Sequence, residues 1–227
     1  MLTQGISALT IIILAFILFD FVLERILDSI NSKSWDLPIP QELSGIYDDE
    51  KYAKARSYHK AKERLSRITT VFSTLLIIAF LWFKGFALVH LQIATLTAAP
   101  VLQALLFFGV FAIVSDIIGL PFELYGIFVI EEKFGFNKMN WKTYVSDKIK
   151  GYVLGAIIGG VLLSLFVWFY TIAGANFWWY AWILFSGFTI FFAMFYTSLI
   201  VPIFNKLEPL ENGTLRDKIE AFAQKVN

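Results

Sequence analysis

The chain has few residues suited to a catalytic or metal site. It contains two histidines, His59 and His90, and no cysteine, so thiol nucleophiles, disulfides and thiolate metal ligands are absent. No HExxH sequence places two histidines one helical turn apart beside a glutamate, and no GxSxG, Walker A or GxGxxG sequence occurs. We expect the two histidines on opposite sides of a membrane, where they cannot share a metal. The sequence therefore predicts no catalytic residue, no metal ligand and no cofactor within this chain.

Acidic side chains are the remaining candidates for chemistry. Asp116 and Glu123 are the two acids of an otherwise apolar region, and carboxylates inside a membrane segment commonly line a polar cavity or a proton path. Both lie toward the end of that region, where water is close, so a structural role is equally open. The adjacent pair Glu131 and Glu132 is the other acidic feature, although Lys133 directly after it also fits a solvated loop.

Composition places these residues in a membrane protein. The chain is 58% hydrophobic and 16% charged, whereas a soluble domain is near 45–50% and about 25%. A bilayer core of about 30 Å requires roughly 20 apolar residues per helix. We predict an all-α, polytopic membrane protein with about five transmembrane helices, which cover residues 6–23, 68–89, 100–120, 151–173 and 177–204.

Basic residues gather on one side of these predicted spans. All of the 19 lysines and arginines except Lys84 fall in segments 24–67, 131–150 and 206–227. The positive-inside rule then places the N-terminus outside and the C-terminus in the cytosol. Because acidic and basic residues nearly cancel, nothing indicates a nucleic-acid partner, and the lipid bilayer is the partner that the composition predicts.

The spans divide the chain into two parts. Residues 1–205 are expected to form an N-terminal membrane domain, with a cytosolic linker and polar helix over 31–67 and a cytosolic loop over 131–150. Residues 206–227 carry an apolar stripe at helical spacing that needs something to pack against. We predict that this segment is the cytosolic start of a catalytic domain missing from the chain.

Two local features leave alternatives open. Pro121 either kinks a helix that continues to Ile130, or residues 121–130 lie at the cytosolic interface. Gly151, Gly155 and Gly159 form a stripe of small residues on one helix face, which permits close helix packing. That stripe fits either packing within the chain or a dimer contact.

Three stretches of the chain resemble segments of one known family. Residues 120–141, LPFELYGIFVIEEKFGFNKMNW, with Asp147 and Lys150 downstream, resemble the signature before the fourth span of the type I CAAX prenyl proteases. Residues 201–226, VPIFNKLEPLENGTLRDKIEAFAQKV, resemble the segment that leads to the catalytic domain, with Ile203 where the family usually has leucine. Residues 47–62, YDDEKYAKARSYHKAK, are similar to the tyrosine-rich segment after the first span.

The resemblance implies an integral-membrane zinc metalloendopeptidase that acts on peptide or prenylated-protein substrates in the bacterial inner membrane or the endoplasmic reticulum membrane. In that family, an HExxH helix and a downstream glutamate hold the zinc, and these residues would follow Asn227. This chain then resembles the N-terminal membrane half, which helps to enclose an intramembrane chamber and positions the catalytic half, its partner. Alone it should be inactive. The positions expected to hold loops against the catalytic half are Glu131, Glu132, Asn137, Pro202 and Asn205.

Other functions fit parts of the sequence. A self-sufficient transport or scaffold/adaptor protein could use Asp116 and Glu123 in a polar path, although the internal repeats common in transporters are absent. The intramembrane glutamate-type CAAX proteases also use paired glutamates. They carry an arginine four residues after the second glutamate, and Phe136 stands at that place here. The first resemblance is therefore the leading hypothesis.

Overall fold

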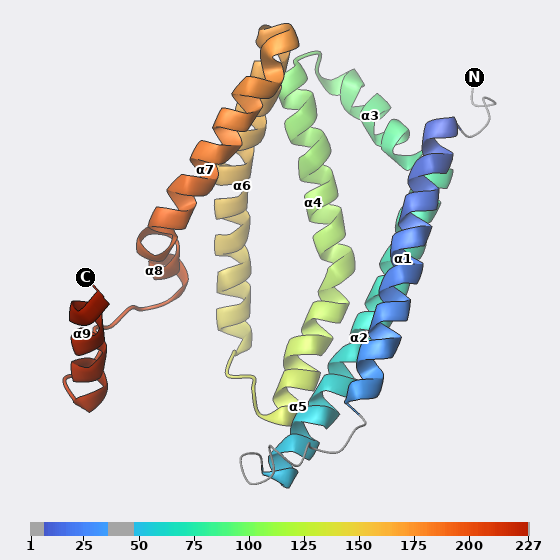
Figure 1. The fold of residues 1–227 in the computed structure, drawn as a ribbon. Helices are drawn as coiled ribbons and strands as arrows, with labels where there is room; N and C mark the ends of the chain where they lie inside the picture. The colour runs from blue at the N-terminus through green and yellow to red at the C-terminus, as the bar shows by residue number, and fades with distance from the viewer. Residues whose placement is uncertain (1–6, 36–47, 227) are drawn as a thin grey trace. The chain divides into compact units, whose positions relative to one another are not determined.

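The computed structural model describes residues 7–35 and 48–226, and these residues are predominantly helical. This confirms the prediction of an all-α protein. Most of the predicted linker lies outside the described residues. The elements, drawn in Figure 1, are α1 (Ala8–Ser34), α2 (Asp49–Trp82), α3 (Gly85–Leu96), α4 (Pro100–Tyr125), the π-helix η2 (Gly126–Glu131), α5 (Glu132–Phe134), α6 (Trp141–Ala173), the 3-10 turn η3 (Gly174–Asn176), α7 (Phe177–Leu199), α8 (Val201–Phe204) and α9 (Thr214–Val226).

Three helical runs within the described residues are long and apolar enough to cross a membrane. They are Glu50–Trp82, Pro100–Phe134 and Trp141–Phe204. The third run contains both α6 and α7, which are joined by η3 and contact each other. This run therefore holds two of the predicted spans. The apolar part of α1 is interrupted by Asp20, Glu24 and Arg25, and α1 is not one of the three runs. A span over residues 6–23 stays a prediction.

The structure divides the predicted span 68–89 at a turn. Helix α2 ends at Trp82 and α3 begins at Gly85, with Lys84 between them in the left-handed conformation at φ 55°. A Cβ on Gly85 would lie 2.5 Å from Cδ1 of Phe80, so any other residue there would require the Phe80 ring to move. Four phenylalanine rings then pack α2, α3 and α4 together, with centroids 4.9–5.6 Å apart: Phe80, Phe86, Phe107 and Phe111.

Residues 121–130 continue the helix that contains Pro121. Helix α4 extends through this proline to Tyr125, and η2 and α5 follow without a break. Proline removes one backbone donor from the helical ladder, and the π-helix that begins at Gly126 is a second departure from α-helical hydrogen bonding. The helix therefore continues past Ile130, as the first alternative expected.

The chain divides into two compact units, Met1–Asn140 and Trp141–Asn227. In the first unit, α2 contacts α1, α3 and η2, and α3 also contacts α4. In the second unit, α6 packs against α7, and the ring of Phe166 meets those of Phe177 and Phe185 at 4.9 and 5.8 Å. Contacts between helices thus build both units.

Few apolar side chains are buried inside either unit. Among the described residues, the buried hydrophobic side chains are Ile93, Ile130, Phe134 and Tyr144. Open space surrounds the glycine stripe of α6, because a Cβ at Gly151, Gly155 or Gly159 would meet no atom within 4 Å. Apolar surface of this extent is covered by lipid or by another protein segment in a stable protein.

Candidate functional site

Glu131, at the end of η2, is bound by two side chains from α2. Its Oε1 accepts a hydrogen bond from the Tyr58 hydroxyl at 2.6 Å and from the Lys62 ammonium at 3.0 Å. Tyr58 and Lys62 are four residues apart and therefore lie on one face of α2. We call these three residues the Glu131 clamp. Hydrogen bonds to an ionised carboxylate are stronger than neutral ones, so the clamp is a specific tie between two elements distant in sequence.

The backbone of Glu131 also closes the turn that follows it. Its carbonyl oxygen accepts the N–H groups of Phe136 at 2.9 Å and Asn137 at 3.2 Å, and Gly135 N–H donates to the Glu132 carbonyl at 3.0 Å. Gly135 adopts φ 77°, the left-handed conformation of a Schellman helix end. Glu131 thus holds the turn with its main chain and α2 with its side chain.

The predicted residues Glu132 and Asn137 meet within this turn. The Asn137 amide donates to Glu132 Oε2 at 2.9 Å, and Asn137 Oδ1 accepts the Met139 N–H at 2.7 Å. Asparagine suits the position because its side chain can bond to the backbone two residues on. The structure therefore brings Glu131, Glu132 and Asn137 together in residues 131–137.

Aromatic contacts surround the clamp. The Tyr58 ring meets Phe134 edge-on at 5.3 Å and Phe136 at 4.9 Å, and Phe134 is buried. The Lys54 ammonium lies 5.8 Å from the centre of the Phe136 ring. Edge-to-face rings and cation–π pairs each add a modest stabilisation. Tyr58 therefore joins the turn through both its hydroxyl and its ring.

The π-helix determines where Glu131 points. A π-helical turn holds one residue more than an α-helical turn, which rotates the following side chains by about 100° about the helix axis. Gly126, the first residue of η2, is buried, and a Cβ there would lie 3.5 Å from Cδ2 of Leu65 on α2. The π-helix is thus one of the places where this helix meets α2, and it precedes the clamp directly.

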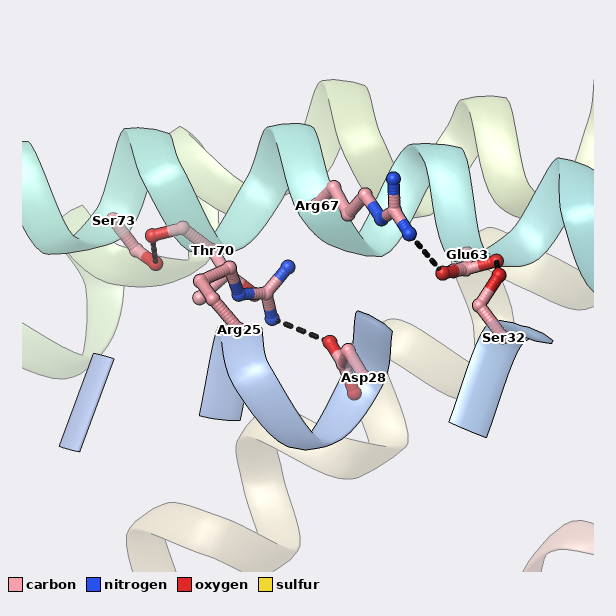
Figure 2. Close-up of polar contacts among 7 residues, drawn as sticks. All are labelled: Arg25, Asp28, Ser32, Glu63, Arg67, Thr70 and Ser73. Atoms are coloured by element: carbon pink, nitrogen blue, oxygen red, sulfur yellow. Dashed lines mark hydrogen bonds and ion pairs between the residues drawn. The ribbon is translucent and has the colours of Figure 1, made fainter. Parts of the chain in front are cut away.

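A second polar contact joins α2 to the end of α1 (Figure 2). The Ser32 hydroxyl donates to Glu63 Oε2 at 3.0 Å, and Arg67 donates to Glu63 Oε1 from within the same helix. Beside it, the Trp35 indole stacks on the His59 imidazole with centroids 4.3 Å apart. His59 therefore takes part in packing between the two helices.

The other predicted site residues lie elsewhere. Asp116 and Glu123 are on α4, half-buried and exposed respectively, and two helical turns apart. Pro202 is exposed in α8, and the Asn205 N–H donates to the Val201 carbonyl at 2.9 Å. These two belong to the second unit, in which the Lys150 ammonium lies 5.7 Å from the centre of the Phe204 ring. The functional roles of these residues stay predictions.

The described residues do not fit a zinc site. No group of three or more His, Asp or Glu side chains in this part of the chain could hold a metal ion. Zinc requires about four converging ligands. We therefore assign no residue of the described segments to zinc.

The sequence prediction missed Tyr58, Lys62, Phe134 and Phe136 as members of the site. The spacing of Tyr58 and Lys62 shows that they share a helix face, but the acceptor of the Tyr58 hydroxyl lies 73 residues further along the chain. A single sequence carries no signal for such a pairing.

The comparisons with known proteins decide the family. A family model described as "CAAX prenyl protease N-terminal, five membrane helices" matches residues 30–206. This chain belongs to that family. It is 32% identical to CAAX prenyl protease 1 of Saccharomyces cerevisiae, a match that covers 83% of this chain and 44% of the relative. It is 34% identical to Probable CAAX prenyl protease 1 of Schizosaccharomyces pombe, with 88% of this chain and 48% of the relative covered.

A solved structure agrees with this assignment. The crystal structure of S. mikatae Ste24p is similar with a TM-score of 0.89 and 31% sequence identity, covering 98% of this chain and 54% of that chain. The chain therefore spans about half the length of the relatives it matches. The predicted family, the all-α membrane architecture and the multi-pass membrane location are confirmed. The outside and cytosolic placement of the termini stays a prediction.

Proposed function

We propose that this chain forms the N-terminal membrane domain of a CAAX prenyl protease-like zinc metalloendopeptidase. Its spans would form part of an intramembrane chamber, and its cytosolic turns would position the catalytic half of the protease. The observation that carries the proposal is the likeness to S. mikatae Ste24p, which extends over 98% of this chain and 54% of that chain. Zinc, held by the HExxH helix and its downstream glutamate, belongs to the catalytic half.

The exposed apolar face of α9 supports the proposal that this helix packs against the catalytic half. Leu215, Ile219 and Phe222 lie on one face of this helix and are 61%, 52% and 68% exposed. Arg216 and Glu220, one turn apart on another face, form an ion pair at 2.7 Å. A helix with one apolar and one charged face is stabilised by packing against another segment. We assign that role to the catalytic half.

The names and organisms of the relatives support a proposal for the substrate class and for the membrane in which the protein resides. The matched proteins are called CAAX prenyl proteases and come from yeasts, plants, animals and an amoeba. We propose prenylated protein C-termini as substrates and the endoplasmic reticulum membrane, rather than a bacterial inner membrane, as the location. The positive-inside asymmetry supports a cytosolic location for residues 131–150 and α9 in this proposal.

A chimera tests the proposal. This chain would replace the corresponding N-terminal part of S. cerevisiae CAAX prenyl protease 1, and cleavage of a prenylated peptide and bound zinc would be measured in purified proteoliposomes. We expect the chimera to cleave the peptide, and the 227-residue chain alone to show neither cleavage nor stoichiometric zinc. Proteolysis or stoichiometric zinc in the chain alone would contradict the proposal, and so would a well-folded, inactive chimera.

A further inference from the structure

We propose that Tyr58 and Lys62 are positioning residues that set the orientation of the 131–137 turn, and that the two adjacent glutamates have different tasks. Glu131 is the internal tie to α2, whereas Glu132 and Asn137 form the edge of the turn that meets the catalytic half. The task of Glu132 and Asn137 rests on the proposed function. The task of Tyr58, Lys62 and Glu131 rests on this chain alone.

The contacts separate the two glutamates. Glu131 is half-buried, and one of its carboxylate oxygens accepts both donors from α2. Glu132 is exposed, and its carboxylate accepts a hydrogen bond from the Asn137 amide within the same turn. A side chain committed to another helix is poorly placed to meet a further partner, whereas an exposed carboxylate beside an amide is accessible to one.

The backbone explains why the clamp controls orientation. Because the Glu131 carbonyl accepts two N–H groups of the turn, any rotation of Glu131 moves residues 136 and 137 with it. The π-helix before Glu131 is a rare conformation that needs support from its surroundings. Tyr58 and Lys62 supply that support at its end, and η2 also packs against α2.

The absence of cysteine allows a direct test of orientation. Spin labels at Ser66→Cys on α2 and Lys138→Cys after the turn, both exposed positions of the first unit, report the distance between the two elements in a chain without native thiols. We expect one narrow distance distribution in lipid nanodiscs. With Tyr58→Phe and Lys62→Met combined, the distribution should broaden and shift, and Tyr58→Phe alone should produce a smaller change.

Matched controls use the same helix. Tyr52→Phe and Lys51→Met make the same chemical changes at α2 residues that do not contact Glu131, and should leave the distance distribution unchanged. Glu132→Gln keeps the acceptor for Asn137 and should also leave it unchanged. If Tyr58→Phe with Lys62→Met, or Tyr58→Phe alone in case the double variant does not fold, gives the parent distribution, the positioning role is overturned.

Peptidase activity of the chimera separates the two claims. We expect Tyr58→Phe with Lys62→Met and Glu132→Gln each to lower cleavage of the prenylated peptide, although only the first moves the spin labels. If Tyr58→Phe with Lys62→Met moves the labels but neither this variant nor Glu132→Gln lowers cleavage, the positioning role is supported and the proposed task of the turn is contradicted. Unmoved labels overturn the positioning role whatever the activity.

Discussion

The polar half of α2 uses two neighbouring faces to hold two different parts of the first unit. One face carries Tyr58 and Lys62 and binds Glu131 after the π-helix. The adjacent face carries His59 and Glu63 and contacts the end of α1 through Trp35 and Ser32. Both faces use residues four apart, so the same helical geometry serves two joints.

The two carboxylates are used differently. Glu131 accepts two hydrogen bonds, and both donors lie on another element, α2. Loss of Glu131 therefore removes two contacts between elements at once. Glu63 accepts one donor from α1 and one from Arg67 of its own helix, so its loss removes one contact between elements. We infer that the Glu131 face is the stronger joint and that the Glu63 face is a supporting contact.

Glu131→Ala should have the largest effect. The variant leaves Tyr58 and Lys62 without their shared acceptor, and we expect a loss of about 2 kcal/mol in the free energy of unfolding. Reversible unfolding in mixed micelles measures this loss. Glu132→Ala is the control and should cost about 0.5 kcal/mol, since its bond is exposed. Equal costs for the two glutamates would contradict the different tasks assigned to them.

Glu63→Ala should cost less, about 1 kcal/mol, because only the bond from Ser32 joins two elements. The same unfolding measurement applies. The spin-label distance between Ser66→Cys and Lys138→Cys should not change, because Glu63 bonds to Ser32 and Arg67 and not to the 131–137 turn. A shifted distance would show that the two faces of α2 are one coupled joint.

Ser32→Ala should have a smaller effect than Glu63→Ala, about 0.5 kcal/mol, because Glu63 keeps its partner Arg67. Comparing the two variants isolates the contribution of the contact between α1 and α2. A cost for Ser32→Ala as large as that of Glu131→Ala would reverse the ranking of the two joints.

Lys62→Met should have the smallest effect, and it should depend on salt. The side chains of Lys62 and Glu131 are 46% and 23% exposed, so solvent and ions screen the pair and its contribution is about 0.5 kcal/mol or less. The difference from the parent should shrink between low and high ionic strength. Tyr58→Phe should show no such salt dependence, because its donor is neutral; a salt dependence as steep as that of Lys62→Met would assign the clamp to charge alone.

Much of the fold follows from composition and periodicity, whereas its interruptions do not. Long apolar runs predict membrane helices, and the helical runs that include α2, α4 and α6 with α7 are apolar enough to cross a membrane. The turn at Lys84 was not predicted, because lysine rarely adopts a positive φ and because the close approach of Gly85 to the Phe80 ring depends on the folded packing. The π-helix over Gly126–Glu131 was also missed, since no residue pattern in the sequence marks it.

Of the site, the 131–137 turn was predictable from the sequence, whereas the α2 residues that bind it were not. The resemblance of the EEKFGFN sequence to the family singles out Glu131, Glu132 and Asn137, and the structure gathers them into one turn. The α2 half of the clamp depends on two long-range contacts to Glu131. Tyr58 lies 73 positions before Glu131 in the sequence, and Lys62 lies 69 positions before it. Residue spacing assigns Tyr58 and Lys62 to one face but not to a partner.

Copurification would show whether this chain binds the catalytic half of a relative. This chain, with an affinity tag, would be expressed with the C-terminal part of S. cerevisiae CAAX prenyl protease 1 as a separate polypeptide, beside the yeast protein's own N-terminal part as the positive control. We predict that the C-terminal part is recovered with this chain, less with Glu131→Ala, and undiminished with Glu63→Ala. Recovery with the yeast control but none with this chain, or equal recovery with an unrelated five-span protein, would contradict the account.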